Sequence, residues 1–147
     1  MSILKPGKYY IINKHSGTKV GLSPVDPGFS RYAILSAPKD IHGPQLRAVT
    51  WNIEHVGGHL YKLVVEGRVA ASENGQVFGR EGSDQHWTII MRERMDGYTI
   101  EETHQLGVGW ILDDGEKQVM SRRLIVHPSF PPVFPPTEIW EFEQIKN

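Results

Sequence analysis

Short runs of alternating apolar and polar residues cover almost the whole chain, and glycine or proline separates one run from the next. The first two runs are residues 9–12 and 19–22. No stretch keeps apolar residues at positions i, i+3 and i+4 for three helical turns, as an amphipathic helix would. Alternation with a period of two is typical of half-buried strands, so the pattern predicts an all-β protein built from about twelve short strands.

The later strands are predicted wherever the alternation returns. They are expected at residues 32–35, 49–54, 60–66, 69–71, 77–78, 87–91, 98–101, 110–112, 124–126 and 139–142. Asn74-Gly75 lies between two of these runs, and this dipeptide is a strong signal for a two-residue hairpin turn. Residues 118–120 fit either the extension of a strand or part of a loop.

Two recurring motifs divide the strands into three groups. A Tyr-x-aliphatic pair with a glycine shortly before it opens each group, at Tyr9, Tyr61 and Tyr98. A Trp-x-apolar pair closes each group, at Trp51, Trp87 and Trp140. The opening tyrosine and the closing tryptophan lie 42, 26 and 42 residues apart. Three units of four strands, with a shortened middle unit, predict a single β-trefoil domain over residues 1–147.

The closing tryptophans are predicted to fill the barrel core, because a residue that recurs once in each repeat is a packing position. Trp110 is the one tryptophan outside that set. Packing within its own strand and stacking on a sugar ring are both open for Trp110. The trefoil leaves the long loops of the first and third units, residues 23–31, 36–47 and 113–123 and the proline-rich segment, as candidate binding sites.

Composition and charge narrow the class of function. The chain has 16 Lys and Arg against 17 Asp and Glu, and it has no cysteine. The balanced charge predicts neither a nucleic-acid partner nor a membrane partner. Without cysteine, disulfides and zinc-thiolate sites are excluded. The first residues contain no leader-like apolar run, so we expect a cytoplasmic protein.

Catalytic and metal-binding motifs do not emerge. The sequence has no Gly-x-Ser-x-Gly, no P-loop and no dinucleotide fingerprint. His55 and His59 are four residues apart, but two glycines between them predict a turn and not a helix. Asp113, Asp114 and Glu116 have the pattern of a solvated loop face. We therefore expect no enzyme, no cofactor and no metal site.

The stretch from residue 124 to 142 is the most unusual in the chain. An apolar run expected to be a strand leads into a loop with five prolines, and alternating residues ending at Phe142 follow. Because proline lacks an amide donor and has a fixed φ, we expect this loop to be neither helix nor central strand, but stiff and close to polyproline II. It either covers one end of the barrel or docks on a partner at low entropic cost.

The chain resembles the cospin-type serine protease inhibitors of mushrooms, which are cysteine-free β-trefoils. The matching sequences are PGKYYIIN and SGTKVGL within residues 6–22, GWIL at 109–112, and LIVHPSFPPVFPPTEIWEF at 124–142. The resemblance covers essentially the whole chain. It implies a monomeric fungal inhibitor of trypsin-like enzymes that places an exposed loop in the protease cleft, with a use in defence or in control of endogenous proteases.

The family places its inhibitory loop after the second strand in one type and near the last strands in another. An asparagine can serve as the primary residue in the first type, and residues 23–31 contain none. Trypsin-like enzymes carry an acid in the specificity pocket, which favours Arg or Lys. We therefore predict that the protease-binding loop consists of Asp26, Pro27, Gly28, Phe29, Ser30 and Arg31. The prolines stiffen it and Arg31 supplies the cation, although Arg31 also fits a solvated charge at a strand end.

Three other residues are second choices for the reactive position. Lys39 follows a proline, and Lys117 lies at a loop tip whose acidic neighbours would repel an acidic pocket. His127 begins the proline-rich loop, which has no lysine or arginine, and ranks last.

A carbohydrate-binding lectin is the alternative function. Gln85-His86-Trp87 matches the Gln-x-Trp repeat of ricin-like trefoils, but the other two closing tryptophans lack this glutamine. An interaction or toxin module without activity on proteases is a third possibility that the fold permits.

Overall fold

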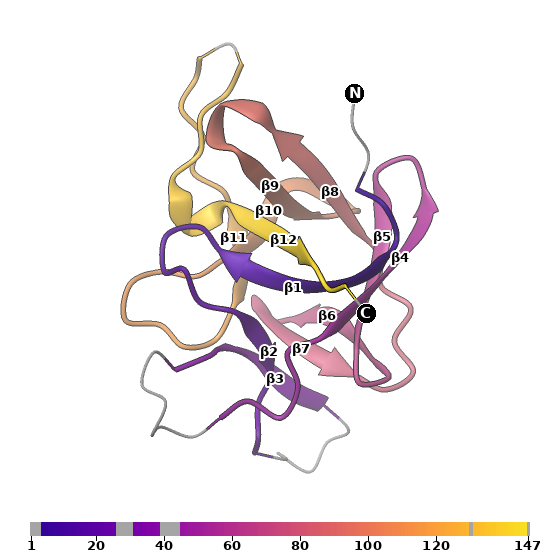
Figure 1. Cartoon of the computed structure of the whole chain (residues 1–147). Helices are drawn as coiled ribbons and strands as arrows, with labels where there is room; N and C mark the ends of the chain where they lie inside the picture. Colours follow the sequence, from indigo (N-terminus) through magenta and orange to yellow (C-terminus); the bar gives the residue numbers. More distant parts are fainter. Residues whose placement is uncertain (1–3, 26–30, 39–44, 130, 147) are drawn as a thin grey trace.

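A computed structural model describes residues 4–25, 31–38, 45–129 and 131–146 of the chain (Figure 1). The described residues form twelve strands and two single-turn 3-10 helices. The strands are β1 (Gly7–Asn13), β2 (Val20–Leu22), β3 (Arg31–Ser36), β4 (Trp51–Gly57), β5 (Leu60–Val65), β6 (Arg68–Glu73), β7 (Gln76–Arg80), β8 (Trp87–Arg92), β9 (Gly97–Glu102), β10 (Gln105–Ile111), β11 (Met120–Arg123) and β12 (Trp140–Gln144). The 3-10 helices are η1 (Glu93–Met95) and η2 (Pro136–Glu138).

Six of the strands close into a barrel. The antiparallel pairings run β1–β4, β4–β5, β5–β8, β8–β9, β9–β12 and back to β1. The other six strands form three hairpins, β2–β3, β6–β7 and β10–β11, which meet one another through β3–β7 and β7–β11. Each unit thus gives two strands to the barrel and one hairpin to its cap. This arrangement is the predicted β-trefoil.

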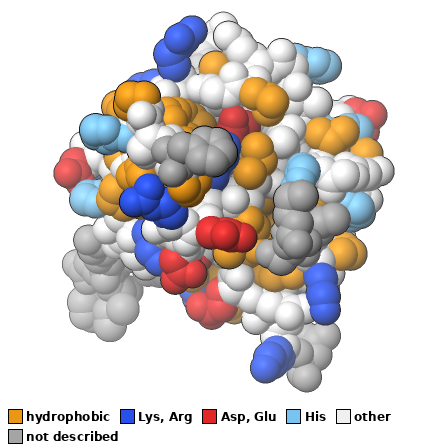
Figure 2. All heavy atoms as spheres, turned by 90° about the horizontal axis from the view of Figure 1, so that it is seen from above, with side chains coloured by type: hydrophobic (Ala, Val, Ile, Leu, Met, Phe, Trp, Pro, Cys, Tyr) orange, Lys and Arg blue, Asp and Glu red, His pale blue; other side chains and the backbone are white. Residues whose placement is uncertain are grey.

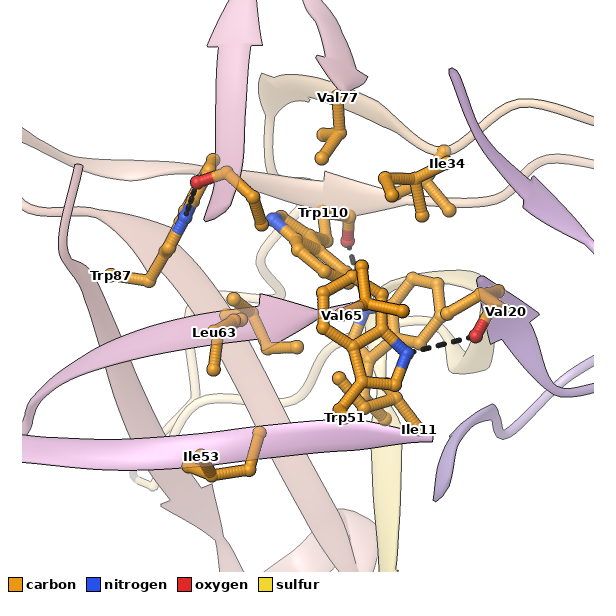
Figure 3. Close-up of a cluster of buried hydrophobic side chains, with 14 of the residues drawn as sticks. Ile11, Val20, Ile34, Trp51, Ile53, Leu63, Val65, Val77, Trp87 and Trp110 are labelled. Atoms are coloured by element: carbon orange, nitrogen blue, oxygen red, sulfur yellow. Dashed lines mark hydrogen bonds between the residues drawn. The ribbon is translucent and has the colours of Figure 1, made fainter. Parts of the chain in front are cut away.

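An equivalent side-chain hydrogen bond in each unit joins the barrel to the cap (Figure 3). The indole N–H groups of Trp51, Trp87 and Trp140, which all lie in barrel strands, donate to the carbonyls of Val20, Ala70 and Trp110 at 2.9, 2.9 and 3.0 Å. Each acceptor lies in the first hairpin strand of the same unit. The prediction that these tryptophans belong to the core is confirmed, because all three are fully buried.

Trp110 lies in the middle of this tryptophan cluster. Its ring centroid is 5.9, 5.7 and 5.6 Å from those of Trp51, Trp87 and Trp140, in tilted or edge-on contacts. Its side chain is also fully buried. Trp110 therefore packs in the core, and a fully buried ring cannot stack on a sugar.

The short turns follow the local sequence. Asn74 and Gly75 have φ values of +50° and +78° and connect Glu73 to its partner Gln76, which confirms the predicted two-residue turn. Glu66 and Gly67 form a second such turn, with φ values of +50° and +75°. These two tight turns shorten the middle unit.

The predicted strand at residues 124–126 is wrong. The last hairpin strand, β11, ends at Arg123, so part of the predicted loop 113–123 is a strand. Beyond Leu124, whose N–H still donates to the Gly107 carbonyl at 2.7 Å, the chain leaves β10. Ile125 and Val126 are 68% and 44% exposed. Their apolar character indicated a buried strand, but they face solvent.

The proline-rich segment also differs from the prediction in one respect, since it contains the single-turn helix η2. Pro136 is its first residue, where the missing amide donor would have no helical partner in any case. Pro135, directly before it, is extended with φ −66° and ψ 150°, as expected for a polyproline-like segment.

The tryptophan cluster predicts an unequal response to substitution. Replacing Trp51, Trp87 or Trp140 by Phe removes a buried hydrogen bond, whereas the Trp110 indole N–H has no partner among the described residues. Trp110→Phe and Trp51→Phe are both expected to lower the free energy of unfolding. The loss for Trp110→Phe should be about 1 kcal/mol smaller than the loss for Trp51→Phe. Urea unfolding followed by circular dichroism measures the difference. Equal losses in the two variants would contradict the assigned hydrogen bonds.

Candidate functional site

The candidate loops lie at two ends of the molecule (Figure 1). The proline-rich loop between β11 and β12 stands out at the top of the view, beyond β8 and β9, while the β2–β3 hairpin lies at the bottom. Of the predicted protease-binding residues, Asp26, Pro27, Gly28, Phe29 and Ser30 lie outside the described residues, as does the second-choice Lys39. Arg31, Lys117 and His127 lie within them.

The described start of the β2–β3 loop is held against the barrel. Ser23 is buried, and its Oγ accepts the Val25 N–H at 3.1 Å, which forms a tight turn at the end of β2. Pro24 has a fixed φ, and Val25 directly after it is 69% exposed. The loop therefore leaves the barrel through a short, braced segment that presents an apolar side chain to solvent.

Arg31 is the first residue of β3, at the other base of the loop. Its Nη1 donates to Glu73 Oε2 at 2.6 Å, and its guanidinium carbon lies 4.5 Å from the centre of the Phe78 ring. Glu73 also accepts a short hydrogen bond from Arg80. The Arg31 side chain is one-third exposed. It joins the loop base to β6 and β7, a role that the sequence did not predict.

The electrostatics of Glu73 follow from this pair. The hydrogen bond from Arg31 is the main cause that lowers the pKa of the Glu73 carboxyl below its usual value of 4.5, and the charges of Arg80 and Arg31 add to it. Partial burial acts in the opposite direction. The carboxylate is therefore charged at neutral pH and holds both arginines.

Lys117 lies on the loop between β10 and β11, and its side chain is exposed. Its carbonyl accepts the Ser36 N–H at 2.7 Å, so the loop is tied to β3. The acidic residues around it already have hydrogen-bond partners: Arg122 bonds Asp113 and Glu116 at 3.5 and 3.3 Å, and His15 Nε2 lies 2.7 Å from Asp114 Oδ1.

A groove of about 320 Å³ brings three of the four candidate loops together. It is mostly apolar and is lined by residues from all three, among them Val25, Pro38, Leu46 and Lys117. Tertiary structure thus places the described residues 23–25, 36–38, 46 and 116–117 beside one another, although they are far apart in the sequence. The proline-rich loop does not contribute to this groove.

The proline-rich loop has its own turn. The His127 N–H donates to the Val133 carbonyl at 2.8 Å, and Ser129 Oγ donates to the Pro131 carbonyl at 2.9 Å. Phe134 is buried at the base, whereas His127 and Pro128 are exposed. Figure 2 looks onto this end of the molecule, where apolar side chains form several patches between charged ones. Only the base of the loop therefore covers the core.

The Gln-x-Trp element has a structural role. The Gln85 side chain accepts the Ser72 N–H at 3.0 Å and donates to Ser72 Oγ at 3.2 Å, which ties the end of β6 to the segment before β8. Trp87 is fully buried. The Trp87 ring is therefore not available to stack on a sugar.

No cluster of three or more His, Asp or Glu residues suited to a metal ion occurs in the described ranges. No helix among those ranges is long and apolar enough to cross a membrane.

The proteins that this chain resembles include inhibitors of proteases. The family model described as peptidase inhibitor I66 matches residues 1–144. A protein named serine protease inhibitor from Lentinula edodes is 28% identical over 97% of this chain and 99% of its own length. The structure of a proteinase inhibitor from Coprinopsis cinerea is 27% identical, with a TM-score of 0.82, over 97% of this chain and 99% of that one. The Rhizoctonia solani agglutinin, 17% identical with a TM-score of 0.69 over 99% of both chains, shares the fold.

The Arg31–Glu73 pair predicts a loss of stability in acid. Because the pKa of Glu73 is lowered by folding, its contribution is complete above its unfolded value near 4.5 and is lost as the pH falls through the lower folded value. The melting temperature of the wild-type protein should fall between pH 5 and pH 3. We expect a smaller fall in Glu73→Gln. The exposed Glu143→Gln serves as control, and an unchanged pH slope in Glu73→Gln would contradict the pair.

Proposed function

Because the chain belongs to the peptidase inhibitor I66 family, we propose that it inhibits trypsin-like serine proteases by placing residues 23–31 in the substrate cleft of the enzyme. The family match and the serine protease inhibitor from Lentinula edodes support protease inhibition. The chain is thus an inhibitor of proteases and not an enzyme. The trypsin-like specificity and the choice of loop are the proposal.

The observation that carries the choice of loop is its fastening at both ends. Ser23 braces one base, and the pairing of Arg31 with Arg80 between β3 and β7 braces the other. A loop whose two ends are fixed loses less conformational entropy when it enters a rigid cleft. The apolar groove beside Val25 and Leu46 adds a surface that the rim of the cleft can cover.

Arg31 is the proposed residue for the specificity pocket. In the free protein its guanidinium already lies against a carboxylate, and in the complex it would exchange Glu73 for the acid of the pocket. A partly exposed ion pair contributes about 1 kcal/mol at most, so this exchange is a modest cost. One monomeric inhibitor then binds one protease reversibly and competes with the substrate.

Titration of trypsin activity tests the proposal. Wild-type protein is expected to inhibit stoichiometrically, and Arg31→Ala is expected to raise the inhibition constant about 30-fold or more, as for a hot-spot residue. Lys8→Ala, which removes an exposed cation on β1 outside the groove, is the matched control and should leave the constant unchanged. Circular dichroism confirms the fold of each variant. No inhibition by the wild type would reject the trypsin-like target.

Glu73→Gln separates two roles of Arg31. If Arg31 enters the pocket, removal of its partner charge should strengthen inhibition by up to about fivefold, the equivalent of a 1 kcal/mol ion pair. If Arg31 only holds the base of the loop, Glu73→Gln should weaken inhibition as Arg31→Ala does. This second outcome would move the reactive position to another residue.

A further inference from the structure

The base of the proline-rich loop is closed by one buried carboxyl group. Glu138, on η2, accepts the backbone N–H of Ile125 on its Oε2 at 2.7 Å. This bond joins the first and last residues of the segment 125–138. The Glu138 residue is 1% exposed, and its Oε1 has no hydrogen-bond partner among the described residues.

The surroundings of this bond are apolar. Leu124 and Ile139, the chain neighbours of its two ends, belong to one buried cluster with Ile111 and Phe134. A carboxylate in such a place loses hydration that a single N–H cannot replace. The neutral, protonated carboxyl is therefore the form that fits the closed loop.

The charges that face Glu138 increase this preference. Asp113, after β10, and Glu101, on β9, are both acidic and disfavour a further negative charge. Arg92, on β8, is bound to Glu101 at 2.8 Å, and its guanidinium lies over the Phe134 ring. From the β1 side, Lys14 pairs with Asp96 and Glu141 at 3.8 and 3.9 Å. Glu138 forms no ion pair with either cation.

We propose that Glu138 is a proton-operated clasp, which holds the proline-rich loop closed in acid and loosens it as the pH rises toward neutrality. The inference rests on the buried bond, the unpartnered oxygen and the apolar cluster. It does not depend on the proposed protease target or on the β2–β3 hairpin, which lies at the other end of the molecule (Figure 1).

The direction of the effect follows from linkage. Burial, with the charges of Asp113 and Glu101 and against the Ile125 hydrogen bond, raises the pKa of Glu138 from its usual 4.5 to about 7. Between these two values the open form is ionised and the closed form is not. The equilibrium constant for opening therefore rises by up to tenfold per pH unit from 4.5 to 7, and it is constant above 7.

The clasp controls a surface that is ready for contact. Ile125, Val126 and the residues from His127 to Ser129 are exposed, and prolines stiffen the loop. A partner that binds the closed loop would meet an ordered surface in acid and would have to order a looser one at neutral pH. Binding through this loop is thus expected to be stronger in acid.

Carbon-13 NMR of the Glu138 carboxyl in the wild-type protein tests the clasp directly. The expected midpoint of titration for Glu138 is near 7, and the exposed Glu141 provides the internal reference. A midpoint for Glu138 near 4.5 would overturn the proposal. This measurement needs no variant, so it does not depend on whether a substituted protein folds.

Amide hydrogen exchange gives the second readout. After correction for intrinsic exchange, protection of the Ile125 N–H should fall by up to tenfold per pH unit between 4.5 and 7. The Leu124 N–H, bound to the Gly107 carbonyl, is the neighbouring control. In Glu138→Gln, which keeps an acceptor but cannot ionise, this pH dependence should vanish, while Glu141→Gln should retain it. If protection of the Ile125 N–H in the wild type did not depend on pH, the clasp would be overturned.

Trypsin titration separates this proposal from the proposed function. Glu138→Gln should leave inhibition through residues 23–31 unchanged, whereas Arg31→Ala should leave the titration of Glu138 unchanged. If Glu138→Gln abolished inhibition with the fold intact, the two ends of the molecule would not be independent, and the clasp would have to be part of the inhibitory site.

Discussion

The packing of four tryptophans in the core is the constraint on which the rest of the structure depends. Three indole N–H groups, one per unit, reach from the barrel strands to the hairpin cap, and Trp110 fills the space between their rings. Because each of these large rings is also held by a hydrogen bond, the cap can shift little relative to the barrel. The hairpins, and the loops that extend from them, are therefore held at defined positions.

The three units differ in the length of their connections, and this difference decides where long loops occur. In the middle unit, two-residue turns close both sides of β6, so that hairpin presents little beyond its strands. The first and third units keep their long connections. Because the cap brings β3, β7 and β11 together, the loops of these two units share one groove, whereas the β11–β12 loop lies at the opposite end.

Both exposed loops are fastened at the base by a carboxyl group, but in opposite electrostatic environments. Glu73 meets two arginines, which lower its pKa and keep it ionised. Glu138 meets a backbone N–H in an apolar cluster, where burial raises its pKa to about 7. The first fastening is strongest when the carboxyl is charged, and the second when it is neutral. A change in pH within the acidic range therefore acts differently at the two ends of the molecule.

The sequence by itself determined the trefoil. Alternation of apolar residues, the spacing of tyrosine and tryptophan and the Asn74-Gly75 turn are local or periodic signals, and the structure follows them closely. The family resemblance, carried by the segment 124–142, is confirmed by the match over residues 1–144. The strand prediction failed at residues 124–126. These residues are apolar but have no strand partner, because hydrogen bonding to β10 ends with the Leu124 N–H.

Only the tertiary structure decided which side chains meet. Arg31 and Glu73 are 42 residues apart, and Ile125 and Glu138 are 13 apart across a proline-rich loop. No periodicity connects such pairs, since each contact depends on how barrel and cap close around the core. The same holds for the groove shared by Val25, Leu46 and Lys117. Periodic burial specifies a fold from local sequence, whereas charge pairing and loop proximity exist only after the chain has closed.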